Sequence, residues 1–594
     1  MTEKWSLTDI YPSFDSPEFL ADYESLAPAV EKLNDLSGKL STFEDAVALV
    51  RLLEDYVNTI SRLSSYAGFT FAADTENETA DKYSYLIETV NAETSRTSVR
   101  LAAFLAKQDD LKNLAKAHNI SEYAYGFIRQ AENHKHLMSE DEETLTAQLT
   151  TTASSAWGVL QEKLISGLTC KYKDPKQDGK KRKIHINECR NLAYDPDPAV
   201  RKAAYEAELK AYPKIEESCA AALNGIKGEV NLLSRLRKYE SPLAETLENS
   251  AMTQKTLDAL FTAIDANIDC FRDYMKAKAK YLAKSQSRQY SKGLPFYDMF
   301  APVGQSANKT FTYDQAKAFV LENFNAFSPQ MAAIAEEAFE KSWIDVYPRE
   351  GKVSGAFCGD IYAIKQFRIL LNFGNALSDA ITLAHELGHG YHSMQIMQEG
   401  ILNTNYPMPL AETASTFCEL IVTGAALAAM PDDEKLQLLE NSIQDATQVT
   451  LDIYSRFLFE KSVFENRLDH PLSPTELKGL MLDAQKKAYG DGLDPDYMHP
   501  YMWVIKPHYY SGGRSYYNFP YAFGYLFAGG LYQIFRKDPN SFGEKYDNFL
   551  RATGKMSIKD SCALMGIDVE DVAFWSGAID VIKKDIKEFE RLTQ

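Results

Sequence analysis

Several long stretches of this chain repeat apolar residues at intervals of about 3.6, the spacing that places them along one face of an α-helix. The clearest of these stretches are 43–66, 81–105, 200–233, 254–282 and 434–464. Glycine contributes only 30 of the 594 residues, and the alternating pattern of half-buried strands is rare. The sequence therefore predicts an all-α, mainly helical body in which amphipathic helices each bury one face.

One short region departs from the helical pattern and predicts strands. The segments 354–358 and 361–367 flank Gly359-Asp360, and the apolar run 369–373 ends at Gly374-Asn375. Short runs bounded by turn residues are typical of strands. We expect a small β-sheet here, and two roles for it stay open. It is either a cover over the core or an exposed edge that pairs with the backbone of a bound peptide.

A change in composition marks a candidate boundary along the chain. Residues 171–183 are rich in Lys, Asp and Gly, and include the basic run 179–183. In an acidic chain, such a run predicts a solvated loop or hairpin. A second helical block begins after Asp195-Pro196-Asp197-Pro198, where the prolines favour the start of a helix. We therefore predict an N-terminal helical region at 1–195 and a second domain at 196–594.

Charge, cysteine content and hydropathy narrow the range of partners. The net charge of -19 and the pI near 5.1 disfavour nucleic acid and anionic membranes as partners. The seven cysteines are scattered and contain no C-x-x-C pair, so a disulfide framework is not expected. The first residues lack the features of a signal peptide, and no uncharged apolar run of about 18 residues occurs. We expect a cytoplasmic protein that binds neither nucleic acid nor membrane.

The segment Leu383-Ala384-His385-Glu386-Leu387-Gly388-His389 contains the pattern H-E-x-x-H within an apolar helical run. Residues four apart lie on the same face of a helix, so the imidazoles of His385 and His389 can bind one metal ion. Glu386 is placed to act as the general base that activates water. The pattern predicts a metal-dependent hydrolase, and a zinc peptidase is its most specific interpretation.

A catalytic zinc ion usually has three protein ligands, so a third ligand is expected outside this helix. The helix is predicted to end near Glu399-Gly400, and a second apolar segment follows with Glu412 in its first turn. We assign Glu412 as the third ligand and Glu419, on the same face, as the partner that fixes one ligand imidazole. The residues after His389 exclude a third histidine ligand of the H-E-x-x-H-x-x-G-x-x-H type. We interpret His392 as a residue of the pocket wall or of the surrounding shell.

A tyrosine-rich segment at 508–526 contains further candidate residues for the active site. It begins with His508, contains Gly512-Gly513, and predicts a loop that leads into a helix. Several of its aromatic rings are expected in the core, but histidine and tyrosine hydroxyls are also suitable donors to a developing oxyanion. The absence of interleaved basic residues disfavours a base-stacking platform.

These motifs together resemble the M3 family of zinc metallopeptidases, in particular its oligoendopeptidase F branch, which is related to thimet oligopeptidase. The resemblance rests on 354–358, 385–392, 412–415 with Glu419, and 508–525. The opening segment Trp5-Ser6-Leu7-Thr8-Asp9-Ile10-Tyr11 is also similar to that branch. The resemblance extends over essentially the whole chain.

The resemblance implies a helical, clam-like body with a deep substrate channel between two parts, and one Zn²⁺ ion per chain held by His385, His389 and Glu412. It implies that His508 and Tyr517 stabilise the tetrahedral intermediate. The residues that would contact the substrate are Gly355 and Ala356, through the backbone, and Tyr510, Tyr521 and Tyr525, along its path. The stretch 512–514 lengthens the spacing after His508 relative to the commoner pattern. The tyrosine that reaches the oxyanion is therefore left open.

The function expected on these grounds is a zinc-dependent endopeptidase that hydrolyses internal bonds of short unfolded oligopeptides. A zinc carboxypeptidase on a similar helical channel fold stays open, because Arg514 offers a positive group for a terminal carboxylate. A catalytically idle peptide-binding protein is disfavoured by the intact His-Glu-His set. The ligand set also accepts cobalt or manganese, and the sequence leaves the oligomeric state undetermined.

Overall fold

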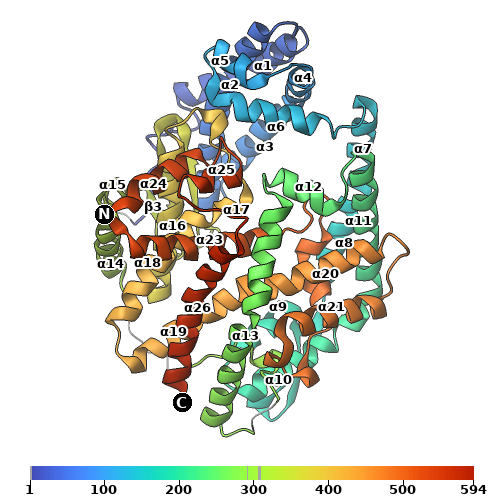
Figure 1. The fold of residues 1–594 in the computed structure, drawn as a ribbon, viewed down its shortest axis with the longest axis vertical. Helices are drawn as coiled ribbons and strands as arrows, with labels where there is room; N and C mark the ends of the chain where they lie inside the picture. Colours follow the sequence, from blue (N-terminus) through green and yellow to red (C-terminus); the bar gives the residue numbers. More distant parts are fainter. Residues whose placement is uncertain (1–2, 290–291, 305–309) are drawn as a thin grey trace. The chain divides into compact units, whose positions relative to one another are not determined.

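Helices make up most of the structure, a computed structural model that describes residues 3–289, 292–304 and 310–594 (Figure 1). The described residues also form two small sheets, one of two strands and one of three. The prediction of a mainly helical body with a small sheet is confirmed. The chain divides into two compact units, each assembled from three separate stretches of sequence.

Unit 1 comprises residues 1–137, 308–426 and 534–567. Its elements are α1 (Pro17–Ser37), α2 (Phe43–Ala73), α3 (Glu78–Ala92), α4 (Ser95–Leu105), α5 (Leu111–Ala117), α6 (Ala124–His134), α14 (Tyr313–Phe327), α15 (Pro329–Glu340), β3 (Ile344–Asp345), β4 (Phe357–Ile361), β5 (Gln366–Leu370), α16 (Leu377–Ile396), α17 (Met408–Ala411), α18 (Thr413–Ala429), α24 (Pro539–Ala552) and α25 (Ile558–Ala563). The last residues of α18 belong to the other unit.

Local sequence signals and aromatic packing explain the N-terminal helices of unit 1. The start of α2 has a capping box, in which Thr42 and Asp45 each satisfy a backbone N–H of the first turn. The buried faces of α1 and α2 meet over an aromatic cluster, where Tyr11, Phe19 and Tyr66 contact one another edge-on or tilted. Such contacts add to the free energy gained from burying the rings.

The three-stranded sheet lies in unit 1, with strand order β3-β5-β4. Strands β4 and β5 form an antiparallel hairpin in which Phe357 pairs with Leu370 and Ile361 with Gln366. The prediction of strands here is right, but the predicted turn at Gly359-Asp360 is wrong, because both residues lie within β4. The chain turns instead through residues 362–365, where Lys365 adopts a left-handed conformation with φ 52°.

Unit 2 comprises residues 138–307, 427–533 and 568–594. Its elements are α7 (Glu140–Thr152), α8 (Ser154–Ser166), β1 (Thr169–Asp174), β2 (Lys180–His185), α9 (Ile186–Asn191), α10 (Pro198–Leu209), α11 (Glu216–Leu236), α12 (Pro242–Asn249), α13 (Gln254–Ser285), α19 (Asp432–Thr447), a π-helical turn (Gln448–Asp452), α20 (Ile453–Asn466), α21 (Pro474–Tyr489), α22 (Met502–Ile505), α23 (Phe519–Lys537) and α26 (Val572–Thr593). The basic run at 179–183 lies in the β1–β2 hairpin, as predicted.

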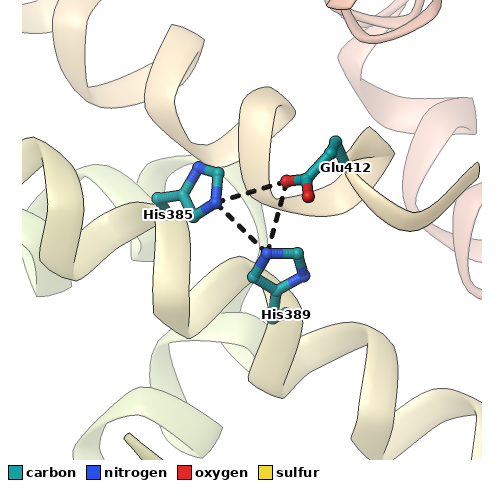
Figure 2. A group of neighbouring side chains, drawn as sticks. All are labelled: His385, His389 and Glu412. Carbon is teal, nitrogen blue, oxygen red and sulfur yellow. Dashed lines mark hydrogen bonds and ion pairs between the residues drawn. The ribbon is translucent and has the colours of Figure 1, made fainter. Parts of the chain in front are cut away.

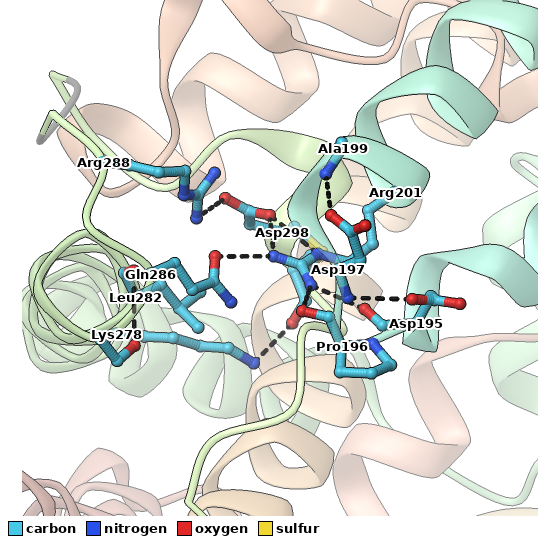
Figure 3. Close-up of polar contacts among 12 residues, drawn as sticks. Asp195, Pro196, Asp197, Ala199, Arg201, Lys278, Leu282, Gln286, Arg288 and Asp298 are labelled. Atoms are coloured by element: carbon cyan, nitrogen blue, oxygen red, sulfur yellow. Dashed lines mark hydrogen bonds and ion pairs between the residues drawn. The ribbon is translucent and has the colours of Figure 1, made fainter. Parts of the chain in front are cut away.

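A buried polar network ties several parts of unit 2 together (Figure 3). The guanidinium of Arg201, on α10, is buried and donates to Asp298 Oδ1 at 2.7 and 2.9 Å. It also donates to the carbonyl oxygens of Asp195 and Pro196, at 2.7 and 2.9 Å. Asp197 caps α10 by accepting from the backbone N–H of Ala199. A side chain of α10 thus fixes the proline-rich segment that leads into this helix.

Two of the predicted long helices are interrupted. The predicted helix at 81–105 is divided between α3 and α4, with the break at Glu93-Thr94. The predicted helix at 200–233 is divided between α10 and α11, and the break contains Pro213, which cannot donate a backbone hydrogen bond. The stretch 434–464 continues from α19 to α20 through the π-helical turn.

Among the residues that the structure describes, one segment, Met408–Ala429, is long and apolar enough to span a bilayer by length and composition. Its mean hydropathy is 1.2, and 56% of the apolar window is buried inside the protein. It also carries Glu412 and Glu419. The segment comprises α17 and α18, and its buried residues pack into the protein core.

Candidate metal centre

Helix α16 carries three of the predicted site residues, which are His385, Glu386 and His389. Its first turn is held by Asp379, whose carboxylate accepts from the backbone N–H groups of Gly374 and Ala376, each at 2.8 Å. The preceding strand β5 packs against α16, so the helix is fixed to the sheet before it reaches His385. The residues around the two histidines, 383–384 and 386–388, are buried, while His385 and His389 keep 22% and 20% of their side chains exposed.

Glu412 approaches the two histidines from a break between two helices. It follows α17 and precedes α18, and its backbone, with φ -88° and ψ 3°, is outside the helical range. The prediction that Glu412 lies in the first turn of one continuous helix is thus wrong in detail. The break turns its side chain toward His385 and His389, as Figure 2 shows.

Three ligand atoms converge at one point (Figure 2). The Nε2 atoms of His385 and His389 are 3.2 Å apart, and each is 3.4 Å from Glu412 Oε2. Two ligand atoms that each lie about 2.05 Å from a tetrahedral zinc ion are about 3.3 Å apart. The spacing and chemistry of this donor set therefore fit a single tetrahedral metal ion with one position open.

Glu419, on α18, fixes the orientation of one histidine. Its Oε1 atom is 2.8 Å from Nδ1 of His385. Because a carboxylate only accepts, the proton of a neutral His385 lies on Nδ1 and its Nε2 lone pair faces the cluster. Burial disfavours the charged form of His385, but the hydrogen bonds to Glu412 and Glu419 outweigh it and raise its pKa to about 10. For Glu412, burial is outweighed by its bonds to both histidines, and its pKa is lowered.

The Glu419 carboxylate gives a testable contribution to metal affinity. Glu419→Gln keeps the size of the side chain but removes the negative charge that makes His385 a stronger metal ligand. We expect the affinity for the metal to fall by roughly 10- to 100-fold, measured by competition with a chromogenic chelator. Glu399→Gln is the control, because Glu399 lies past the end of α16 and pairs with Lys555. An affinity equal to that of the wild type would contradict the role of Glu419.

Glu386 is buried beside the cluster without a fixed partner. Its side chain is 5% exposed, and no described residue hydrogen-bonds to its Oε2 atom. Burial raises the pKa of Glu386, and the electrostatic effect of the neighbouring imidazoles opposes this shift in part. A buried, unpaired carboxylate oxygen is costly unless something else binds it. This atom is therefore available to a proton donor such as a water molecule.

Gly388 allows α16 and α18 to come into backbone contact. A Cβ atom at this position would lie 2.6 Å from the carbonyl oxygen of Ala414 and 2.7 Å from Cα of Ser415. Only glycine fits here without moving one of the helices. The close approach brings the start of α18, and Glu412 with it, beside the histidines of α16.

Gly388→Ala is expected to separate α16 from α18 and to disrupt the ligand cluster. We expect a loss of about 1–3 kcal/mol in the free energy of unfolding, together with weaker metal retention. Thermal unfolding and metal analysis of the purified variant would measure both. Gly68→Ala, on the exposed face of α2 with no atom within 4 Å of the new Cβ, is the matched control. It should be neutral or stabilise by up to about 1 kcal/mol. Equal behaviour of the two variants would contradict this explanation.

His392 is a core residue one turn after His389 on α16. It is fully buried, its Nε2 atom lies 2.9 Å from Thr553 Oγ1, and its ring stacks on Tyr406. Burial, with a smaller effect of His389, lowers its pKa to about 3, so it stays neutral. The interpretation of His392 as a residue of the shell around the ligands agrees with this position better than one in a pocket wall.

Gly355 and Ala356 precede strand β4, which lies at one edge of its sheet. Gly355 has φ +85°, a conformation that other residues rarely adopt. Its carbonyl oxygen accepts from Asn372 Nδ2 at 2.8 Å, and the same amide group donates to Val353. A strand at the edge of a sheet has backbone groups that can pair with an added strand.

The tyrosine-rich segment lies in unit 2. His508 is in a 3₁₀ turn at Pro507–Tyr510, and its ring centre lies 5.0 Å from that of Tyr517. The Tyr517 hydroxyl accepts from the Tyr521 hydroxyl at 3.4 Å. Tyr510 is 5% exposed, whereas Tyr521 and Tyr525, on α23, are half-buried. The predicted loop leading into a helix is confirmed, since α23 begins at Phe519.

Two residues beside His508 were not predicted. Asn518 Oδ1 lies 3.2 Å from His508 Nδ1 and accepts from an Nη atom of Arg456 at 3.3 Å. Arg456 lies far away in sequence, on α20. The sequence offered one signal for Asn518, its position immediately before a predicted helix. It offered none for Arg456. Arg514, exposed, lies over the ring of Tyr517.

Sequence comparison identifies two matching families. The profile described as Peptidase family M3 matches residues 191–581, and the profile described as Oligopeptidase F matches residues 106–169. Among curated proteins, oligopeptidase PepF of Bacillus subtilis is 25% identical over 612 residues, covering 99% of this chain and 87% of that protein. Group B oligopeptidase PepB of Streptococcus agalactiae is 24% identical and covers 99% of this chain and 97% of its own.

Solved structures share the fold. A protein from Chlamydophila abortus superposes with a TM-score of 0.87 at 20% identity, covering 99% of this chain and 98% of that chain. Oligoendopeptidase-F from Enterococcus faecium has a TM-score of 0.69 at 20% identity, with 97% and 98% covered. At such identities the likeness supports the helical fold.

Proposed function

This chain belongs to peptidase family M3 and is a metalloendopeptidase of oligopeptides, and on that premise we propose that its metal is one zinc ion held by His385, His389 and Glu412. The observation that carries the proposal is the spacing of the three donor atoms, 3.2 to 3.4 Å, which suits tetrahedral zinc. Two imidazoles and one carboxylate are also a common ligand set of zinc peptidases.

In the proposed mechanism, zinc when bound polarises the scissile carbonyl and makes the attacking water more acidic. Glu386 accepts a proton from that water and donates it to the leaving amine. Its position supports this role, because it follows a ligand histidine and has an unpaired, buried carboxylate oxygen. Glu419 holds His385 in the orientation that binding requires.

For the tyrosine-rich segment, the proposal rests on the family resemblance. Tyr517 donates a hydrogen bond from its hydroxyl to the developing oxyanion, and His508, whose ring lies beside it, contributes to the same step or to substrate binding. The substrate contacts proposed on the same ground are those of Gly355, Ala356, Tyr510, Tyr521 and Tyr525. A deep substrate channel remains part of this proposal.

The remaining proposals concern the cellular location of the enzyme, its partners and its domain boundaries. We propose that the protein acts in the cytoplasm on short unfolded peptides, without nucleic acid or membrane partners. This is supported by the net charge of -19 and by the burial of 56% of the apolar window in Met408–Ala429. We also propose that the sequence domains are 1–195 and 196–594.

One assay tests the function. The protein is incubated with internally quenched peptides blocked at both termini, with and without a chelator. We expect internal cleavage that the chelator abolishes and added Zn²⁺ restores. Cleavage restricted to peptides with a free C-terminus would support a carboxypeptidase that uses Arg514. Absence of cleavage in every metal-loaded sample would contradict an active peptidase.

A further inference from the structure

His508 is joined to a chain of buried polar groups within unit 2. Its Nδ1 atom lies 3.2 Å from Oδ1 of Asn518, which also accepts from Arg456 at 3.3 Å. Arg456 forms an ion pair with Asp452, one turn earlier. Asp452 Oδ1 in turn accepts from the hydroxyl of Tyr489 at 2.8 Å. Asn518 and Tyr489 are 2% and 1% exposed, so the chain is shielded from water.

The chemistry of Arg456 determines which way the Asn518 amide points. A guanidinium has donors only, so the atom of Asn518 that faces it must be the carbonyl oxygen. The opposite orientation would place the NH₂ group of Asn518 against the donors of Arg456. The same oxygen faces His508, and because it only accepts, the proton of the His508 ring lies on Nδ1.

The surrounding charges keep His508 neutral. Burial lowers its pKa, and Arg456 and Lys506 lower it further, while the bond to Asn518 and the charge of Glu460 act in the opposite direction. Glu460 is itself paired with Lys227 at 2.7 Å. The rings next to His508 belong to Tyr517 and, through it, Tyr521, and neither is positively charged. A neutral imidazole with its proton on Nδ1 carries a lone pair on Nε2.

We propose that His508 acts as a hydrogen-bond acceptor through Nε2 and binds a backbone N–H of the peptide substrate, and that Asn518 and Arg456 are the positioning residues that hold it in this form. His508 is half-buried, and within the described part of the chain its only side-chain hydrogen bond is formed by Nδ1. The open Nε2 atom therefore needs a donor. Donation to the oxyanion then belongs to Tyr517. The nature of the ligand rests on the proposed peptidase function.

The tautomer of His508 can be measured without any activity. The protein is labelled with ring ¹³C,¹⁵N-histidine, and the His508 signals are identified by their loss in His508→Phe. We expect the wild type at neutral pH to show a neutral ring protonated at Nδ1. Asn518→Leu should shift the ring toward the form protonated at Nε2. Asn518→Asp, which keeps an acceptor, should retain the Nδ1 proton and raise the pH at which the ring ionises.

Asn231→Leu provides the matched control, because Asn231 is also in unit 2 and donates to the carbonyl oxygen of Phe464 at 3.2 Å. It should leave the His508 signals unchanged. A wild-type His508 that is protonated at Nε2, alone or as the imidazolium, would overturn the proposal. An identical His508 spectrum in Asn518→Leu would remove Asn518 from its positioning role.

The substrate half of the proposal is tested with blocked peptides that are N-methylated at one backbone nitrogen at a time. At one position we expect methylation to reduce the kcat/KM of the wild type by about tenfold, mainly through KM. In His508→Phe the same methylation should have little effect, because the acceptor is already absent. If methylation lowered kcat/KM equally in the wild type and in His508→Phe at every position, the proposed bond from the substrate N–H to His508 would be overturned. If the wild type cleaves no blocked peptide, the proposed function fails, and the NMR result still decides the tautomer.

Discussion

Replacing Glu386 by Gln is expected to abolish nearly all turnover while leaving the metal in place. The amide cannot accept the proton of the attacking water, so the loss should be about a thousandfold in kcat, within the range attributed to a general base. The ligand atoms of His385, His389 and Glu412 are unchanged. Metal analysis should therefore give one ion per chain in the variant. Both quantities are measured on one preparation with a blocked, internally quenched peptide.

The control for this variant is Glu399→Gln, which makes the same chemical change in unit 1, at a residue paired with Lys555. It should retain the turnover of the wild type. Glu386→Gln that cleaves peptides at a rate within tenfold of the wild type would remove Glu386 as the base. A variant that has lost its metal would instead assign Glu386 a structural role.

Glu412→Gln is expected to produce the largest loss of metal. Its Oε2 atom is the only carboxylate oxygen in the cluster of three donor atoms, and it faces both Nε2 atoms at 3.4 Å. Without its charge, the site binds a divalent cation mainly through two neutral imidazoles. The affinity should fall by more than the roughly 100-fold upper limit expected for Glu419→Gln. Activity should fall in parallel and recover in part at high zinc concentration.

The comparison between Glu412→Gln and Glu419→Gln separates a ligand from a supporting residue. Both glutamates are partly exposed and both contact His385. If Glu419→Gln lost more metal than Glu412→Gln, the assigned roles would have to be exchanged. Full metal retention by Glu412→Gln would leave the third ligand to another residue.

The sequence predicted those features that depend on neighbours along the chain. The spacing of His385 and His389 is enough to place both on one helix face. Apolar periodicity predicts α13 to within three residues and the start of α2, although α2 continues seven residues past its predicted end. Residue Glu412 was assigned from its distance along the chain after the first helix. Its position in a helix break, which turns its side chain toward the histidines, depends on packing that periodicity does not encode.

Features that depend on contacts between distant residues escaped prediction. The contact of Gly388 with the backbone at 414–415 requires knowledge of how α16 and α18 cross. The hydrogen bond from Arg456 to Asn518 joins residues on α20 and before α23. The turn of the β4–β5 hairpin was misplaced because Gly359-Asp360 is a turn signal, whereas Gly359 packs against the ring of Phe69. Gly359 is therefore needed for its contact with a residue distant in sequence and does not mark a turn.

The third stretch of unit 1 has a consequence for biosynthesis. The side of α16 that bears Tyr391 and His392 is held by Asp547 and Thr553, in residues 534–567. The ribosome makes these residues long after the histidines of α16. We therefore expect the nascent chain to remain without a finished metal centre until residues 534–567 have been synthesised and have packed against α16. While residues 1–533 are being made, the unfinished metal centre then protects them from being cut by their own chain.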